Sequence, residues 1–308
     1  MPDKAHAKTD RKIEQMEKRL SGIYSGSADI IEKKAADYFR QFERLDEKKR
    51  KQVENGTLTE AEYKRWRKNK LLYAERFKIL QNQIATEMLN VNKTAISYVN
   101  GQLPEVYAIN YNSIGETVDG VGGYSFTMVD ANTVKELATR NSRLLPYKYI
   151  DQRKDKKWNM QNVHRSVLQS ILTGESIPDM AKRLRGVEEM NRTQSVRTAR
   201  TLTTAAENKG RQDGMEQAVS DGIILEKFWI RTHDARTREE HIEAGRRYTE
   251  SRSIPIDKPF YVGGQYLMHP GDSSMGASGS NIYNCRCTMG TVVKGIDFGG
   301  GGVEWLEK

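Results

Sequence analysis

Residues 59–98, TEAEYKRWRKNKLLYAERFKILQNQIATEMLNVNKTAISY, decide the fold class of this chain. Apolar side chains recur there at steps of three, four or seven, which is the spacing of one face of an α-helix. They are Tyr63, Trp66, Tyr73, Phe77, Leu80, Ile84, Met88, Val91, Ala95 and Tyr98. Thr59 can cap the first turn, with Glu62 returning the hydrogen bond. The pattern predicts one continuous helix of about 40 residues, roughly 60 Å long.

A second helix is expected upstream, because apolar residues between Ile30 and Leu45 repeat the same spacing. The polar run 46–57, which contains Asn55-Gly56, supplies a turn, so residues 1–100 are expected to form a basic helical hairpin or arm. Its cations are candidates for contact with DNA phosphates, although a solvated basic face is the commoner outcome. These candidates are Lys48, Lys49, Arg50, Lys51, Lys64, Arg65, Arg67, Lys68 and Lys70.

The composition agrees with long hydrated helices. Of the 308 residues, 37% are hydrophobic and 30% are charged, and the net charge is +9. Residues 1–100 carry 22 Lys and Arg against 15 Asp and Glu, so most of the excess charge lies in the expected arm. An apolar stretch of the roughly 18 residues that span a bilayer is missing, and residues 1–12 are too polar for a signal peptide. A soluble protein without a membrane partner is therefore expected.

The middle of the chain divides into two parts. Residues 101–145 are rich in Gly, Tyr and Asn and are interpreted as a connecting loop or a short hairpin. Residues 146–222 are predicted to form a helical domain that is broken at Thr173-Gly174 and restarts near Ile177-Pro178. Three glycines, Gly210, Gly214 and Gly222, are taken as turns or helix ends. On the last helix a row of donors, Arg197, Arg200, Thr204 and Asn208, could pair with acidic residues of the following domain.

After Gly222 the pattern becomes strand-like and rich in turns, with a polar helix between Ile230 and the closing strand at Thr288. We expect a small α+β module over residues 223–295, followed by a Gly-rich tail over residues 296–308. The fold class is therefore mainly α, with an extended N-terminal arm, a middle helical domain and this C-terminal module. Cys285 and Cys287 are too close in sequence for an ordinary mutual disulfide.

The module contains an ordered set of short motifs. They are WIRTHDARTR at 229–238 with His241 and Gly245, Pro259-Phe260, Gly264, LMHPGD at 267–272, and NCRC at 284–287. Together with Arg197 and Arg200 on the preceding helix, this set resembles the Mu F-like minor head, or head morphogenesis, proteins of tailed phages. The resemblance covers roughly residues 190–295. Its motif residues are Arg197, Arg200, Trp229, Asp234, Arg236, Arg238, His241, Pro270, Gly271, Asp272, Asn284, Cys285, Arg286 and Cys287.

The resemblance implies a minor capsid protein that binds the portal, enters the procapsid and stays inside the head of the virion near the portal. It would be assembled in the host cytoplasm and would influence DNA ejection. The implied partners are the portal protein and double-stranded DNA, with scaffolding or major capsid protein as further candidates. No cofactor and no enzymatic activity are expected.

Two interpretations of the module's polar residues remain open. His233, His241, Cys285 and Cys287 could hold a metal, but Cys-x-Cys in a strand would send its two side chains to opposite faces. Some members of the family look as though they carry Cys-x-x-Cys where this chain has Arg238 and His241. The favoured interpretation is a structural hydrogen-bond cluster of Asp234, Arg236, Arg238, His241 and Asp272, with Arg286 reaching back.

Two classes of function compete with a head protein, namely an enzyme and a DNA-binding protein. His233, Asp234, Glu240 and His241 could serve a metal-dependent nuclease, and ADP-ribosyl transfer is a more remote option, although no matching catalytic motif is present. A DNA-binding or DNA-compaction protein without portal docking is the third possibility. Binding to the portal distinguishes the head protein from this third possibility, whereas turnover of plasmid DNA or NAD that is lost in His241→Ala would favour an enzyme.

Overall fold

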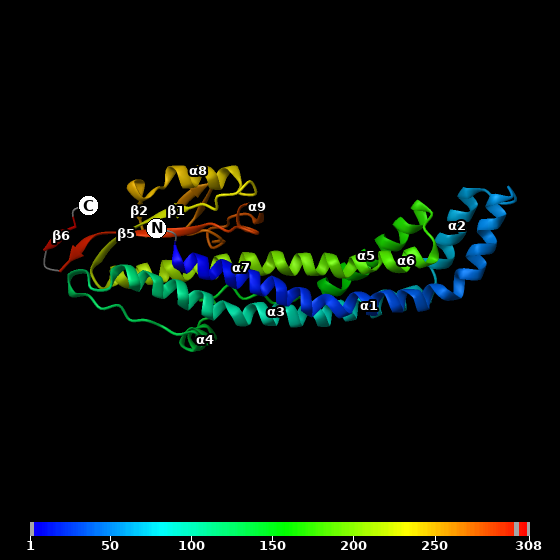
Figure 1. Cartoon of the computed structure of the whole chain (residues 1–308), viewed down its shortest axis with the longest axis horizontal. Helices are drawn as coiled ribbons and strands as arrows, with labels where there is room; N and C mark the ends of the chain where they lie inside the picture. Colours follow the sequence, from blue (N-terminus) through cyan, green and yellow to red (C-terminus); the bar gives the residue numbers. More distant parts are fainter. Residues whose placement is uncertain (1–2, 299–301, 307–308) are drawn as a thin grey trace. The chain divides into compact units, whose positions relative to one another are not determined.

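The computed structural model describes residues 3–298 and 302–306, and most of them are helical (Figure 1). The α-helices are α1 (Lys4–Glu54), α2 (Glu60–Leu71), α3 (Glu75–Val118), α4 (Ala131–Arg140), α5 (Gln152–Thr173), α6 (Ile177–Arg183), α7 (Arg185–Ser220), α8 (Glu239–Arg247) and α9 (Gly279–Ile282). Two short 3-10 helices, η1 (Val121–Gly123) and η2 (Glu250–Arg252), complete the set for the described residues. No described helix has both the length and the apolar character that a bilayer span requires.

The strands all lie in the C-terminal part. They are β1 (Ile223–Ile230), β2 (Ile254–Pro255), β3 (Phe260–Val262), β4 (Gln265–Leu267), β5 (Thr288–Asp297) and β6 (Val303–Trp305). One sheet has the order β2-β1-β5-β6, and β3 and β4 form a separate hairpin. The predicted fold class, mainly α with a small C-terminal α+β module, is confirmed. Within the expected tail, β5 extends to Asp297 and β6 pairs with it, while residues 299–301 and 307–308 lie outside the described residues.

Several helix boundaries follow from local chemistry. Thr59 and Glu62 form the predicted capping box at the start of α2. Gly174 ends α5 in the left-handed conformation, and α6 restarts at Ile177 as predicted. The single continuous helix predicted over residues 59–98 is wrong, because residues 72–74 separate α2 from α3. No glycine or proline marks that break.

The chain forms two compact units, each built from separated segments. The first contains Met1–Glu17, Tyr98–Lys148 and Arg197–Lys308, and the second contains Lys18–Ser97 and Tyr149–Val196. These units combine segments that the sequence analysis assigned to different sequential domains. The second unit has a helical core around Phe39, Phe77 and Met180. The first has two cores, one of them around Trp229 and Phe260 in the module.

The interpretation of residues 101–145 as a loop or hairpin is wrong for most of its length. Helix α3 continues through Pro104 and Gly115 to Val118, and α4 follows after η1. Gly115 sits inside the helix because the ring of Phe126 packs against it, where a Cβ would lie 2.4 Å from Phe126 Cδ1. The glycine here serves close packing and does not form a turn.

Close packing also explains two glycines inside α7, which the sequence analysis took as turns or helix ends. A Cβ on Gly210 would lie 2.5 Å from the carbonyl oxygen of Tyr107, and one on Gly214 would lie 2.9 Å from that of Tyr111. Both glycines are therefore contact points at which α7 approaches the backbone of α3. Gly222 does end the helix, with a φ of 96°.

Gly210→Ala is expected to lower the free energy of unfolding by about 1–3 kcal/mol, because the added methyl meets backbone that cannot rotate away. Gly101→Ala is the matched control, since Gly101 is also inside a helix but has open space at its Cβ position. It should raise stability by roughly 0.5–1 kcal/mol. Thermal unfolding of both variants measures the difference, and equal effects would contradict this account of the α3–α7 contact.

Candidate functional site

The C-terminal half of α7 runs beside β5 (Figure 1). Its buried side chains donate hydrogen bonds to the segment before and within that strand. Thr204 Oγ1 donates to the carbonyl of Cys285 at 2.6 Å, and Asn208 Nδ2 donates to that of Cys287 at 3.2 Å. One turn further on, Arg211 Nη1 donates to the carbonyl of Met289 at 2.8 Å. The row of donors predicted on this helix does contact the module. It binds backbone carbonyls there and not acidic side chains.

The arginines of that row behave differently. Arg200 pairs with Glu17 of α1 at 2.6 Å, and its guanidinium also lies 3.4 Å from Asn284 Oδ1. Arg197 is exposed. The carboxylate expected opposite Arg200 therefore comes from the N-terminal helix and not from the module.

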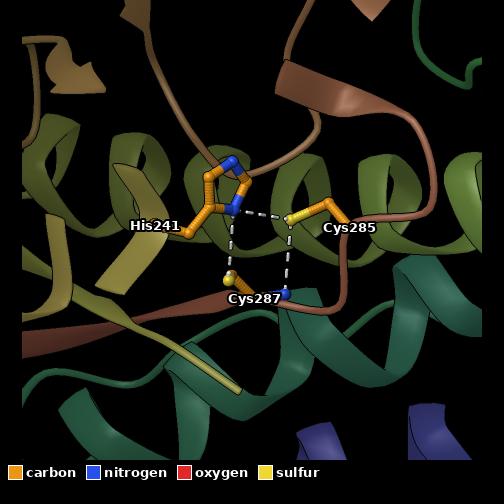
Figure 2. A group of neighbouring side chains, drawn as sticks. All are labelled: His241, Cys285 and Cys287. Carbon is orange, nitrogen blue, oxygen red and sulfur yellow. Dashed lines mark hydrogen bonds between the residues drawn. The ribbon is translucent and has the colours of Figure 1, made fainter. Parts of the chain in front are cut away.

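Three side chains converge where α8 meets the held segment (Figure 2). Nδ1 of His241 lies 3.5 Å from Sγ of Cys285 and 3.5 Å from Sγ of Cys287. All three residues are 2% exposed. The expectation that Cys-x-Cys would point its side chains to opposite faces is wrong, because residues 285–287 precede β5 and are not extended strand. Asn284 adopts a φ of 57° and turns the chain just before Cys285.

Neighbouring groups fix the orientation of the histidine. Nε2 of His241 lies 2.8 Å from Oδ1 of Asn281, and Asn281 is itself held by the carbonyl of Val262. The indole of Trp229 contacts the imidazole edge to face at 5.5 Å. Because Nε2 bonds to an acceptor, it carries a proton, and Nδ1 is the ring nitrogen that faces the two sulfurs. Three N and S donors arranged in this way could hold a soft or borderline metal ion.

The electrostatics of the three groups are coupled. The hydrogen bond with Cys285 and the contact with His241 lower the pKa of Cys287 well below that of a free thiol, against the effect of burial. Burial alone would lower the pKa of His241, but Cys287 outweighs it and raises that pKa. The hydrogen bond with Cys287, together with burial, raises the pKa of Cys285. One sulfur of the pair is thus stabilised as a thiolate.

His233 does not belong to this group. It is exposed, and among the described residues the group of possible metal ligands contains only His241, Cys285 and Cys287. Of the four metal ligands considered from the sequence, three therefore converge and His233 does not. Neither Asp234 nor Glu240 joins the group, so the carboxylate ligands of the nuclease hypothesis are not at this point of the structure.

The single polar cluster predicted from sequence is split into separate contacts. Arg286 reaches back to Asp234 as predicted, at 2.7 Å, and lowers the pKa of that carboxyl well below its usual range. Arg236 also contacts Asp234, whereas Arg238 donates to the carbonyl of Tyr283.

Asp272 lies in a different environment, in the turn after Pro270-Gly271. Its carboxylate accepts from the backbone N–H groups of Met268 and Ser274 at 2.9 and 2.7 Å. Gly271 has a φ of 80° and packs on the backbone of Ala205 in α7, where a Cβ would lie 3.2 Å from the Ala205 nitrogen. The predicted role of these residues as turn chemistry is consistent with this geometry, but Asp272 is not part of the cluster around Asp234.

One predicted DNA contact is wrong. The side chain of Arg67 is fully buried, and its Nε lies 2.8 Å from Oδ1 of Asp46. It therefore ties α2 to α1 and cannot reach a phosphate. The other candidates are exposed or half-buried, namely Lys48, Lys49, Arg50, Lys51, Lys64, Arg65, Lys68 and Lys70.

The sequence analysis missed a second basic surface on the same unit. A groove of about 730 Å³ follows one face of α5 and is lined by Arg153, Lys156, Lys157, His164 and Arg165, with Gln81, Met160 and Gln161. Its cations recur at helical spacing, which was visible in the sequence, but they are outside the arm to which charge counting drew attention. No carboxylate lines the groove as described.

Comparison with known proteins finds a family to which the module and part of the preceding helices are similar. Residues 161–290 match the sequence profile of the family described as Phage Mu protein F like protein. This part of the chain, which is less than half of it, is similar to that family, and the resemblance carried by the motifs at 190–295 is confirmed. The match begins within α5 and ends within β5, so it includes α7 and the three converging side chains.

One curated relative is an NAD(+)–arginine ADP-ribosyltransferase EFV from Enterococcus faecalis (strain ATCC 700802 / V583). It is 30% identical over 150 residues, which is 49% of this chain and 28% of that protein. The chain therefore spans less than a third of the length of this relative. No solved structure matches the chain.

Arg67→Met is expected to cost about 3–5 kcal/mol of stability, because it leaves the buried Asp46 carboxylate without its cationic partner. Lys68→Met is the control on the next, exposed position of the same helix and should stay within about 0.5 kcal/mol of the native chain. Chemical unfolding followed by circular dichroism measures both. A neutral Arg67→Met would show that this arginine is not needed in the hairpin.

Proposed function

We propose that this chain is a non-enzymatic minor head protein of a tailed phage, which docks on the portal, enters the procapsid and contacts packaged DNA. The observation that carries the proposal is the family match over residues 161–290. In this proposal the protein is assembled in the host cytoplasm and is retained inside the head near the portal, where it influences assembly and DNA ejection. Scaffolding and major capsid protein are further proposed partners.

The proposed DNA contact rests on exposed cations of the second unit. Arg65, Lys68 and Lys70 lie exposed on α2, and the groove along α5 adds Arg153 and Lys157. Point charges of this kind neutralise phosphates without reading sequence, which suits a protein surrounded by packaged DNA of any sequence. The contact should therefore be strongly dependent on salt.

The proposed portal contact rests on exposed aromatic groups of the module. Tyr261 and Tyr266 stand on the β3–β4 hairpin with 42% and 54% of their surface exposed, and their rings are 5.2 Å apart. Tyr283, 55% exposed, lies in the segment before Cys285. Tyrosine is enriched at the centres of protein interfaces, because it buries a large rigid area and keeps a hydrogen-bonding group.

The activity in the name of the Enterococcus relative does not enter this proposal, because the similarity reaches 28% of that protein. The alternatives that retain weight are a DNA-binding or compaction protein without portal docking and a metal-dependent nuclease. Portal binding separates the first from our proposal, and turnover of plasmid DNA by the purified chain would favour the second.

Neutralising three cations of α2, in the helical hairpin of the N-terminal arm, tests the DNA contact. Arg65→Gln, Lys68→Gln and Lys70→Gln together should reduce the slope of log binding constant against log salt concentration by about three, since each phosphate contact contributes about 0.9. The control triple variant Lys135→Gln, Arg140→Gln and Arg143→Gln removes the same charge from exposed positions of α4 and the turn after it. Equal slopes of log binding constant against log salt concentration for the two variants would rule out a localised DNA contact at α2.

Co-purification with the portal protein of the same phage tests docking. The full chain, co-expressed with tagged portal protein, should be retained with it, and Tyr261→Ser with Tyr266→Ser should weaken retention at least about tenfold, as expected for two interface aromatics. Tyr73→Ser with Tyr149→Ser is the control, because both rings are exposed outside the module. A native chain that binds DNA but never the portal would support the compaction alternative instead.

A further inference from the structure

The three converging side chains have the dimensions of a metal centre. In a tetrahedral zinc site, Zn–N bonds of about 2.0 Å and Zn–S bonds of about 2.3 Å place each nitrogen about 3.5 Å from each sulfur. Nδ1 of His241 lies 3.5 Å from both sulfurs, and all three ligand atoms are within 4.8 Å of one another. We propose that His241, Cys285 and Cys287 bind one zinc ion, which the family match and the portal proposal do not assign.

The surroundings support this assignment independently of the distances. Oδ1 of Asn281 accepts a hydrogen bond from Nε2 of His241. Histidines that bind a metal through one ring nitrogen commonly donate the other N–H to an acceptor in this way, and here the nitrogen left for the metal is Nδ1. The backbone N–H of Cys287 lies 3.4 Å from Sγ of Cys285, and this contact fixes the position of that sulfur. Both contacts hold a ligand atom in place, so that the nitrogen and the sulfur face one another.

Charge balance makes the site suitable for burial. Two thiolates neutralise Zn²⁺, and the imidazole is neutral when it is bound, so the loaded centre carries no net charge in a place where each ligand is 2% exposed. The soft sulfur donors select zinc over magnesium or calcium, which prefer oxygen. No carboxylate joins the group as described, and a water molecule would complete the tetrahedron.

The zinc has a structural role in this proposal. It joins α8 to the segment that leads into β5. The ligands His241 and Cys285 are 44 residues apart in the sequence. The binding free energy of such a site contributes to folding, because the ligands are not assembled in the unfolded chain. The module would then be held on one side by α7 donors and on the other by the metal.

Metal analysis of the full chain, purified under reducing conditions without chelator, tests the proposal. We expect about one zinc ion per chain in the native protein and less than about a tenth of that in Cys285→Ser with Cys287→Ser. His233→Ala is the matched control, because its exposed ring lies outside the group, and it should keep the metal. Equal loss of zinc in the control would overturn the assignment to these ligands.

A spectroscopic measurement on the native chain keeps the test valid if the cysteine variant fails to fold. Cobalt added to the metal-stripped, reduced protein should give thiolate-to-cobalt charge-transfer absorption and the intense visible bands of tetrahedral coordination. Zinc should displace it and raise the temperature of unfolding. A stripped chain that binds neither ion would overturn the proposal, as would a native chain isolated under reducing conditions without zinc.

The outer-shell contact predicts a graded effect. Asn281→Ala should weaken zinc affinity about 10–100-fold, measured by competition with a chelator, because the imidazole loses the acceptor that fixes its tautomer. Unchanged affinity would show that Asn281 does not position the ligand. None of these measurements involves portal protein or DNA, so their outcome is separate from that of the proposed function.

Discussion

The row of buried donors on α7 is the constraint on which the module depends. Thr204, Asn208 and Arg211 each give a hydrogen bond to a backbone carbonyl between Cys285 and Met289. A buried carbonyl that is left without a partner costs about 1–3 kcal/mol, so these hydrogen bonds favour this path of the chain. Gln212 extends the row to the carbonyl of Ile256 at 3.1 Å. Since side chains here recognise backbone, the helix fixes where the closing segment runs and leaves its cysteine side chains free to face His241.

How far the sequence predicts the fold depends on whether the deciding contact is local. The capping box at Thr59 and the break at Gly174 depend on neighbours in the chain, and both were predicted correctly. Glycine is ambiguous, because it serves turns and close packing equally well. Gly222 ends a helix, whereas Gly115 and Gly210 accept a ring or a backbone from a distant segment. Only the spatial neighbour distinguishes the two uses, so residues 101–118 were misread as a loop.

The candidate site was predictable in composition but not in geometry. His241, Cys285 and Cys287 were singled out from the sequence, but strand alternation argued against their convergence. That objection does not apply, because residues 285–287 precede β5 and are not extended strand. The prediction that Arg67 contacts DNA was wrong for a related reason. A cation within a basic run is expected to be exposed, and only the structure places its partner Asp46, 21 residues earlier, beside it. Charge counting likewise favoured the arm over α5, whose cations gather on one face within a less basic region.

A small module cannot rely on a large core, because the share of surface that a chain buries on folding falls with its size. In the described module, ion pairs and buried hydrogen bonds add to the small core. They are the pair of Arg286 with Asp234, the hydrogen bonds from α7 to the closing segment, and the hydrogen bond from Nζ of buried Lys227 to the carbonyl of Met268 at 2.7 Å. Such ties are directional, so they specify one arrangement more strictly than apolar contacts do. A zinc ion between α8 and residues 285–287 would act in the same way. It would therefore fix the position of the neighbouring Tyr283 and the β3–β4 hairpin as a preformed surface, at little further entropic cost on docking.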